Sequence, residues 1–233
     1  KMKYYLSGQN FKQGGVLEPI ESFVRNTFRA NFSVNATDKL TLKFNGSFTD
    51  TKGPSIAEQG QGENVFYSSL VVEPFINLTE KTTDGKFSNS PTGYTVQGSN
   101  FQNPLYTYQE RVRNFHRNRL LLGVDMSYEF NDNWSMSASQ SIDKSSTEGY
   151  SFTPKGFITP TPNANLNNGA IQRSESVAQT TVSAAQLNYF KDLGDFDLSV
   201  SAKYLFENRQ FRSLSAGGYD LIAQGVFTIN NTP

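Results

Sequence analysis

The sequence has no cysteine, which excludes disulfide bonds and thiolate metal sites. His116 is its only histidine, and we expect no catalytic or metal-binding role for it, because triads and histidine metal sites need several partners at defined geometry. Lysine plus arginine and aspartate plus glutamate number 21 each, so no basic excess predicts a nucleic-acid partner. No segment approaches the ~18 consecutive apolar residues that a membrane-spanning helix needs.

Hydrophobic residues are also scarce for a packed globular core, at 36% of 233 residues with a mean hydropathy of -0.52. Aromatic residues are abundant in contrast, with 19 phenylalanines and 11 tyrosines. A transmembrane β-barrel wall accounts for both observations. Every second residue of its strands faces water, and aromatic residues gather at its membrane interfaces.

Two neighbouring segments, residues 27–36 and 39–49, alternate strictly between polar and apolar or small residues. Alternation puts each set on one face of a β-strand. Pairing of Ala36 with Leu40 across the short turn would bring both apolar sets to the same face. A hairpin that is apolar outside and polar inside is typical of a transmembrane β-barrel. Its apolar face would carry Phe28, Ala30, Phe32, Val34, Ala36, Leu40, Leu42, Phe44, Gly46 and Phe48.

The same pattern recurs along the chain. Tyr128, Phe130 and Trp134 flank the turn of a second hairpin and are expected at one membrane interface. The first strand of a third hairpin leaves its lipid-facing set open between two alternatives, Val182 with Ala184, or Ala185 with Leu187 and Tyr189. The predicted strands after the first hairpin cover residues 119–130, 134–142, 177–190 and 196–208, and a lone strand over residues 3–9 precedes them all.

The connections between these strands alternate in length. Turns of three to five residues follow Ala36, Phe130 and Phe190, whereas long connections at the opposite end span residues 10–22, 52–116 and 144–176. Short turns at one rim and long loops at the other are the outer-membrane arrangement. The predicted fold class is therefore all-β, with about seven strands of a large antiparallel transmembrane β-barrel, long extracellular loops and short periplasmic turns. Within the longest connection we expect a short helix over residues 63–72 and a two-residue hairpin turn at Asp84-Gly85.

Two groups of residues near the end of the longest loop are candidates for ligand or partner contact. Arginines 111, 113, 117 and 119 form either a solvated extracellular rim that contacts lipopolysaccharide phosphates or a substrate-steering patch. Sugars would stack on the aromatic residues of this region, although such residues also pack long loops onto each other. The candidate contact residues are Phe101, Tyr106, Tyr108, Arg111 and Arg113.

No pattern in the sequence predicts catalysis, so we expect no enzyme activity, no cofactor and no bound metal. The glycines at 14–15 and 60–62 lack the helix and the lysine of a phosphate loop. Residues 163–168 form a polar loop tip without the alternating acids of a calcium loop. The inward carboxylates are scattered over different strands and heights and are interpreted as lumen polarity: Asp125, Glu129, Asp197 and Glu207.

The chain resembles the SusC/RagA-type TonB-dependent outer-membrane transporters of Bacteroidota. The resemblance covers nearly the whole chain, and it rests on the order and spacing of several motifs rather than on any single one. The motifs are Y-Y-L-S-G-Q at 4–9 with a Gly-rich loop after it, F-V-R-N-T-F-R-A-N at 23–31, T-D-K-L-T-L at 37–42, N-P-L at 103–105, N-R at 118–119 and Y-E-F at 128–130.

This resemblance implies a barrel of roughly 22 strands with a plugged lumen. It also implies a SusD-like lipoprotein at the extracellular mouth, energy from TonB–ExbB–ExbD, and import of an oligosaccharide or peptide across the lipid of the outer membrane. Residues 1–233 would then be a partial barrel domain, an internal segment without the plug, the N-terminal TonB-contacting segment or the closing strands. The absence of a signal peptide at Lys1 and the loop-like end at Pro233 lead to the same expectation.

Three alternatives remain open at this point. In the first, the chain is part of a passive porin-type or adhesin-type barrel. In the second, it is a soluble secreted β-sandwich that binds carbohydrate, and in the third it is a barrel piece within a larger outer-membrane assembly.

Overall fold

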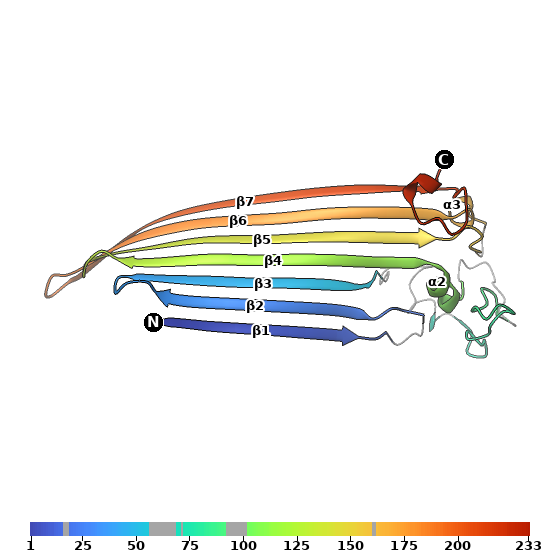
Figure 1. The fold of residues 1–233 in the computed structure, drawn as a ribbon, viewed down its shortest axis with the longest axis horizontal. Coiled ribbons are helices and arrows are strands. Elements are labelled where there is room, and N and C mark those ends of the chain that lie inside the picture. Colours follow the sequence, from blue (N-terminus) through green and yellow to red (C-terminus); the bar gives the residue numbers. More distant parts are fainter. Residues whose placement is uncertain (16–18, 56–68, 71, 92–101, 160–161) are drawn as a thin grey trace.

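The computed structural model describes residues 1–15, 19–55, 69–70, 72–91, 102–159 and 162–233. Seven antiparallel strands form one open sheet in chain order, which confirms the all-β fold and the predicted number of strands (Figure 1). The strands are β1 (Met2–Gln13), β2 (Phe23–Asn35), β3 (Leu40–Pro54), β4 (Val112–Glu129), β5 (Trp134–Thr153), β6 (Ala170–Asp192) and β7 (Asp197–Tyr219). Helical elements are short: α2 (Pro104–Glu110), α3 (Ala164–Asn167) and the 3-10 helix η1 (Ile229–Asn231). No helix in the described ranges has both the length and the apolar character needed to cross a membrane.

Each pair of neighbouring strands keeps a single register from one end to the other. Phe32 lies opposite Phe44, which lies opposite Val124, so the apolar sets of β2, β3 and β4 share one face as the alternation predicted. The backbone N–H of Ala36 donates to the Leu40 carbonyl at 2.8 Å, which confirms the predicted pairing at the first turn.

The register also decides the orientation of β6. Ala138, Met136 and Trp134 of β5 lie opposite Ala185, Leu187 and Tyr189. The second of the two alternatives is therefore correct, and Val182 and Ala184 belong to the polar face. Ring centroids of Trp134 and Tyr189 are 4.7 Å apart, so Tyr189 joins the aromatic residues around the second turn.

We call the apolar surface at the turn end of this face the apolar band. It extends from Leu40 to Phe48 on β3 and from Leu120 to Tyr128 on β4, with Phe130 just after the strand. On β5 and β6 the polar pair Gln140 and Ser183 interrupts it, with a hydrogen bond of 2.6 Å from the Ser183 hydroxyl to Gln140 Oε1. Its side chains are not enclosed by a second sheet: Phe44, Leu122, Val124 and Val200 remain 39–53% exposed. The opposite face of the same strands is polar, with Lys43 and Asp125, for example, directly opposite each other.

Beyond the apolar band the strands continue much further than the sequence predicted. The expected loop over residues 144–176 is wrong, because β5 extends to Thr153, β6 begins at Ala170, and only residues 154–169 connect them. Similarly, β4 begins at Val112 and β7 ends at Tyr219. Both faces of these extensions are largely polar, so the hydrophobic alternation disappears although the backbone pairing continues.

The first two short turns have the same arrangement of hydrogen bonds. The Thr37 hydroxyl accepts hydrogen bonds from the N–H groups of Lys39 and Leu40, at 3.2 and 3.0 Å. Asn131 Oδ1 accepts from Asn133 and Trp134 in the same way, at 3.0 Å each. In each turn one side-chain oxygen accepts from the backbone N–H groups two and three residues further along the chain. This shared arrangement explains why both turns have the same length and register.

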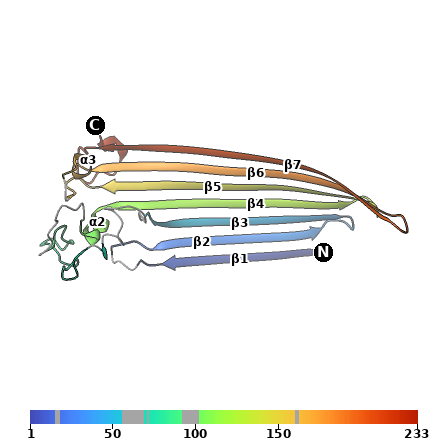
Figure 2. The same cartoon turned by 180° about the vertical axis from the view of Figure 1, so that it is seen from behind.

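All long connections gather at the end of the sheet opposite the short turns, and the C-terminus lies among them (Figure 2). Two apolar clusters are buried there. One consists of Phe87, Leu105, Tyr106 and Phe157, and the other of Phe152, Ile171 and Leu221. The loops at this end therefore have packed cores of their own.

Candidate functional site

Helix α2 positions the candidate residues, and Asn103 fixes the start of this helix. Asn103 is fully buried, and its Oδ1 accepts the Leu105 N–H at 3.0 Å as an N-cap. Its Nδ2 donates to the carbonyls of Leu78 at 3.0 Å and Ser88 at 2.6 Å. One side chain thus joins α2 to the 78–88 segment of the long loop.

Tyr106 belongs to the core under this helix and not to an accessible surface. Its ring stacks on Phe157 with centroids 5.3 Å apart, and only 8% of the residue is exposed. The hydroxyl accepts the Ile158 N–H at 3.0 Å. Burial raises the pKa of the Tyr106 hydroxyl. Because both ring and hydroxyl are occupied by loop packing, we no longer treat Tyr106 as a ligand contact.

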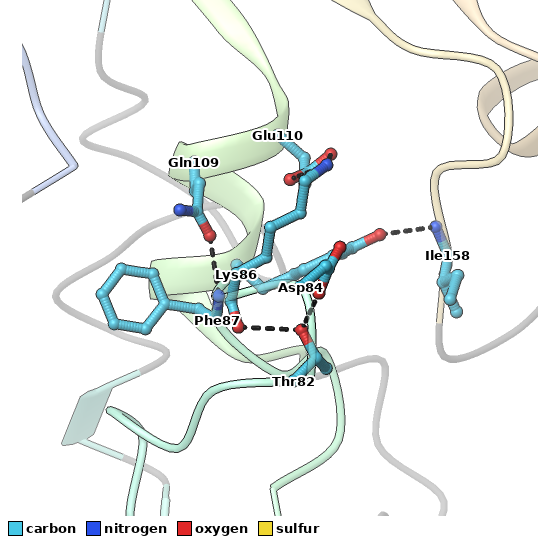
Figure 3. A network of polar contacts seen from close by, with 8 residues as sticks. Thr82, Asp84, Lys86, Phe87, Gln109, Glu110 and Ile158 are labelled. Atoms are coloured by element: carbon cyan, nitrogen blue, oxygen red, sulfur yellow. Dashed lines mark hydrogen bonds and ion pairs between the residues drawn. The ribbon is translucent and has the colours of Figure 1, made fainter.

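A polar network next to Tyr106 holds a tight turn against α2 (Figure 3). Lys86 forms an ion pair of 2.9 Å with Glu110, and this hydrogen bond raises the Lys86 pKa. The Phe87 N–H donates to Gln109 Oε1 at 2.7 Å. The expected turn at Asp84-Gly85 is present, since the Gly85 N–H donates to Thr82 and Thr82 pairs with Lys86. The turn is one residue longer than the predicted two-residue type, because residues 83–85 lie between the paired Thr82 and Lys86. Gly85 adopts the left-handed backbone conformation in this turn, with φ of 79°.

Tyr108, Arg111 and Arg113 line one hollow of about 150 Å³ at the C-terminal end of α2. Pro19, Ile20 and Glu21 close its other side. Arg111 is held in place: its Nε donates to Thr153 Oγ1 at 3.0 Å, and its guanidinium lies 5.6 Å from the centroid of the Phe157 ring. The structure therefore brings together three of the five candidate residues. Phe101 lies outside the described residues.

The arginine cluster does not share the face of the apolar band. Arg113, Arg117 and Arg119 alternate on β4 with the apolar set and so occupy the polar face, opposite the apolar band. Arg117 Nε donates to Thr147 Oγ1 at 3.1 Å, and Arg119 pairs with Asp143. Their side chains lie on the face opposite the apolar band. The two interpretations of the cluster, a solvated rim that contacts lipopolysaccharide phosphates and a substrate-steering patch, both stay predictions.

His116 lies on the face of the apolar band but above it, where Nε2 contacts Asp50 Oδ1 at 2.5 Å. Among the described residues, no group of three or more His, Asp or Glu side chains is arranged to hold a metal ion. The inward carboxylates remain dispersed: Asp125 accepts from Asn45 Nδ2 at 3.3 Å, and Glu207 pairs with Arg209 on its own strand. In the described ranges these carboxylates therefore lie on different strands and have separate partners.

Other expectations have mixed outcomes. The helix predicted over residues 63–72 lies mostly outside the described residues, as do the glycines at 60–62. The polar loop tip at 163–168 contains the short helix α3. Sequence reasoning missed several phenylalanines on the polar face, among them Phe11, Phe23 and Phe115. Their positions along the strands have the opposite parity to the apolar set, and this would have revealed them.

No protein-family model matches the chain, and no curated protein matches it. It is similar to solved structures of the RagAB peptide importer in a closed-closed state (TM-score 0.79) and in an open-open state (0.74), and to a structure of the RagAB peptide transporter (0.77). In each case the identity is 14%, and the match covers 100% of this chain and 25% of the other. The chain thus spans a quarter of the length of these neighbours, and the similarity shows that it has the fold of part of a large β-barrel chain.

Proposed function

We propose that this chain forms part of the barrel wall and the extracellular loops of an outer-membrane importer of the TonB-dependent SusC/RagA type, and that its substrate is a peptide. The observation that carries the proposal is the apolar band on one face of a sheet whose other face is polar. The activity would be transport and not bond chemistry.

The dimensions of the apolar band support a membrane-spanning role. On β3 it reaches from Leu40 to Phe48, and on β4 from Leu120 to Tyr128, with Phe130 just after the strand. A tilted strand of about 9–11 residues crosses a bilayer core. Tyr128 and Phe130, with ring centroids 4.9 Å apart, and Trp134 with Tyr189 lie at the turn end, as expected for an interfacial girdle. In this orientation the short turns are periplasmic and the loops are extracellular.

The two edges of the sheet support a partial barrel. Strands β1 and β7 each pair on one side only, and every residue of β7 except Gly218 is exposed. A long unpaired edge with exposed side chains such as Phe206 and Phe211 would promote aggregation unless further strands pair with it. The remaining strands, the plug and the TonB-contacting segment would then be supplied by other parts of a longer polypeptide.

The fold-level similarity to the RagAB peptide importer favours a peptide over a glycan as substrate, since both were expected from the sequence. By the same similarity we propose a SusD-like lipoprotein as partner at the loop end and TonB–ExbB–ExbD as the energy source. A passive porin or adhesin remains the alternative. The sandwich alternative loses its support, because the strands in the described ranges form a single sheet with no second sheet facing it.

One pair of substitutions in the full-length protein tests the membrane role. Val124→Arg puts a charge in the apolar band, where it should weaken folding in a bilayer by about 2–4 kcal/mol. Ser139→Arg puts the same charge on the polar face next to Asp125 and should be tolerated. Folding into lipid vesicles and recovery in the outer-membrane fraction measure the difference, and equal behaviour of the two variants contradicts a lipid-facing band.

A second measurement separates an energised importer from a passive barrel. Uptake of a labelled peptide by cells should stop when a protonophore dissipates the proton gradient. Uptake that continues unchanged contradicts TonB dependence and favours the porin alternative.

A further inference from the structure

Three phenylalanines of β1, β2 and β4 interrupt the polar face above the height of the apolar band. Phe11 and Phe23 pack edge to face with centroids 6.2 Å apart. Phe23 and Phe115 lie on either side of Gly53, where an added Cβ would be 3.1 Å from Phe23 and 3.5 Å from Phe115. Since only a glycine leaves this gap open, the three rings form one patch across β1 to β4, which we call the inner-wall patch.

Arginines surround the inner-wall patch. The Arg25 guanidinium lies 5.4 Å from the centroid of the Phe11 ring, and Arg25 and Arg117 lie in the same row of paired residues. Arg113 lies beyond Phe115 on β4. The identified partners of Arg25 and Arg117 are the neutral Phe11 ring and the Thr147 hydroxyl.

Acidic side chains are absent from this region of the polar face among the paired strand residues. The rows that contain Arg117, Phe115 and Arg113 carry no aspartate or glutamate from β1 to β7. At the same height, Asp50, Glu148 and Glu175 lie on the opposite face. The outer face also carries the cations Lys52 and Arg173 at this height, so its charge is mixed, whereas the charged paired residues of the inner rows are all arginines.

Next to Phe115 the polar face is hollowed. A depression of about 320 Å³ lies over Gly149, with Arg113, Phe115, Gln172 and Ser174 among its walls. An added Cβ at Gly149 would be 2.5 Å from Ser174 Oγ, so the glycine keeps this floor open. The depression combines a guanidinium, an aromatic ring, an amide and a hydroxyl, which together can hold a carboxylate beside an apolar group.

We infer that the inner-wall patch is a subsite for acidic peptides, with carboxylates bound by Arg113 and Arg117 and apolar side chains packed on Phe115. The inference rests on the proposed function, because it requires the polar face to line the path of the substrate. A positive wall in a confined aqueous passage raises the local concentration of anions. Apolar area buried on the phenylalanines adds affinity that a purely basic surface lacks.

Binding of three labelled pentapeptides to the full-length protein tests this inference. The probes alternate Asp with Phe, Lys with Phe, and Asp with Ala. We expect the Asp/Phe peptide to bind at least about tenfold more tightly than either of the others. The Lys/Phe peptide lacks the carboxylates for charged hydrogen bonds to the arginines, and the Asp/Ala peptide lacks the apolar side chains that pack on Phe115. Equal affinity for the Asp/Phe and Lys/Phe peptides overturns the inference.

Variants locate the binding to the named residues. Arg117→Gln and Arg113→Gln should each weaken Asp/Phe binding about tenfold and reduce its salt dependence. Phe115→Ser should weaken Asp/Phe binding but leave Asp/Ala binding unchanged. Lys52→Gln, a cation at the same height on the opposite face, is the matched control and should have no effect. An effect of Lys52→Gln as large as that of Arg117→Gln shows nonspecific charge attraction and overturns the subsite.

The outcome is separable from the proposed function. If the Val124→Arg and Ser139→Arg variants differ in membrane insertion but the peptides are not distinguished, the subsite fails and the barrel wall stands. If the two variants insert equally, the proposed function itself fails.

Discussion

Arg119 and Asp143 form a two-pronged ion pair across β4 and β5 on the polar face. Arg119 Nε is 3.0 Å from Asp143 Oδ1, and Arg119 Nη2 is 2.7 Å from Oδ2. The direct cross-strand neighbour of Arg119 is Ser145, so the pair is diagonal and joins two rows of the sheet. It also places a carboxylate of β5 next to Arg119, on the same face as Arg117 and Arg113.

Removing the charge of Asp143 should cost little stability. Asp143→Asn should lower the free energy of unfolding by less than about 1 kcal/mol, because the two side chains remain 52% and 37% exposed and exposed ion pairs contribute little. Urea unfolding of the full-length protein in lipid vesicles measures it, with Ser141→Ala on the same strand as control. A loss of about 3 kcal/mol or more would instead indicate a dehydrated pair.

The short turns offer a test of register. Asn131→Ala removes the acceptor of the Asn133 and Trp134 N–H groups and should destabilise the β4–β5 hairpin by about 1 kcal/mol. Asp132→Ala, at the centre of the same turn, is the matched control. Folding yield in vesicles is the readout, and equal losses for the two variants would show that the Asn131 side chain does not set the turn.

The sheet could be predicted from sequence where one face is apolar. Phe44 and Val124 follow strict alternation, and their common face was recognisable without any contact information. The orientation of β6 was not, because small and polar residues occur on both of its faces, and only the pairing of Leu187 with Met136 decides it. The strand extensions were missed for a related reason. Around Glu148 and Glu175 both faces of the strands are polar, so polar and apolar residues do not alternate in the sequence there.

The candidate site was less predictable, because its geometry depends on contacts between distant loops. Tyr106 and Phe157 stack on each other although they lie far apart in the chain. The residues next to Tyr106 in the sequence do not indicate whether this loop tyrosine is buried or exposed, and only an exposed tyrosine could contact a ligand. The positions of Arg113 and Arg117 were predictable in principle. Leu120 and Leu122 have even numbers on β4, whereas Arg113 and Arg117 have odd numbers and so lie on the other face of the strand. Continuing the alternation back toward residue 112 would have assigned both arginines to the polar face.

Asn103 provides a test of the loop core that runs against helix-capping preference. Aspartate is as good an N-cap as asparagine, but Asn103→Asp would place a carboxylate against the Leu78 and Ser88 carbonyls in a fully buried position. We expect the loop core to lose about 3 kcal/mol or more, while the sheet remains folded. Hydrogen exchange of the Phe87 amide reports this local opening.

The control for Asn103 is the N-cap of α3. Asn163 also precedes a helix, but its side chain makes no capping hydrogen bond. Asn163→Asp should therefore leave hydrogen exchange near α2 unchanged. If Asn103→Asp also leaves the exchange of Phe87 unchanged, the side-chain bonds of Asn103 do not hold the 78–88 segment to α2.

Alkaline pH should open the same loop core, and Tyr106 is the group that makes this visible. Burial raises the Tyr106 pKa above the ordinary value of about 10. In the unfolded loop the hydroxyl ionises near the ordinary value, whereas in the folded loop it keeps its proton to higher pH. The folded form therefore binds more protons in this interval, so its stability is fully present below pH ~10 and falls as pH rises further.

Lys86 acts in the same direction, since its pKa is raised by the hydrogen bond to Glu110 and the ion pair is lost when the amine deprotonates. The measurement is the tyrosinate absorbance of the wild type minus that of Tyr106→Phe during an alkaline titration. This absorbance difference should rise at a higher pH than the absorbance of the exposed tyrosines. The exchange of the Ile158 amide should become faster over the same pH interval. A difference curve that follows the exposed tyrosines would show that Tyr106 is hydrated, and the packed core between α2 and the 157–158 segment would have to be rejected.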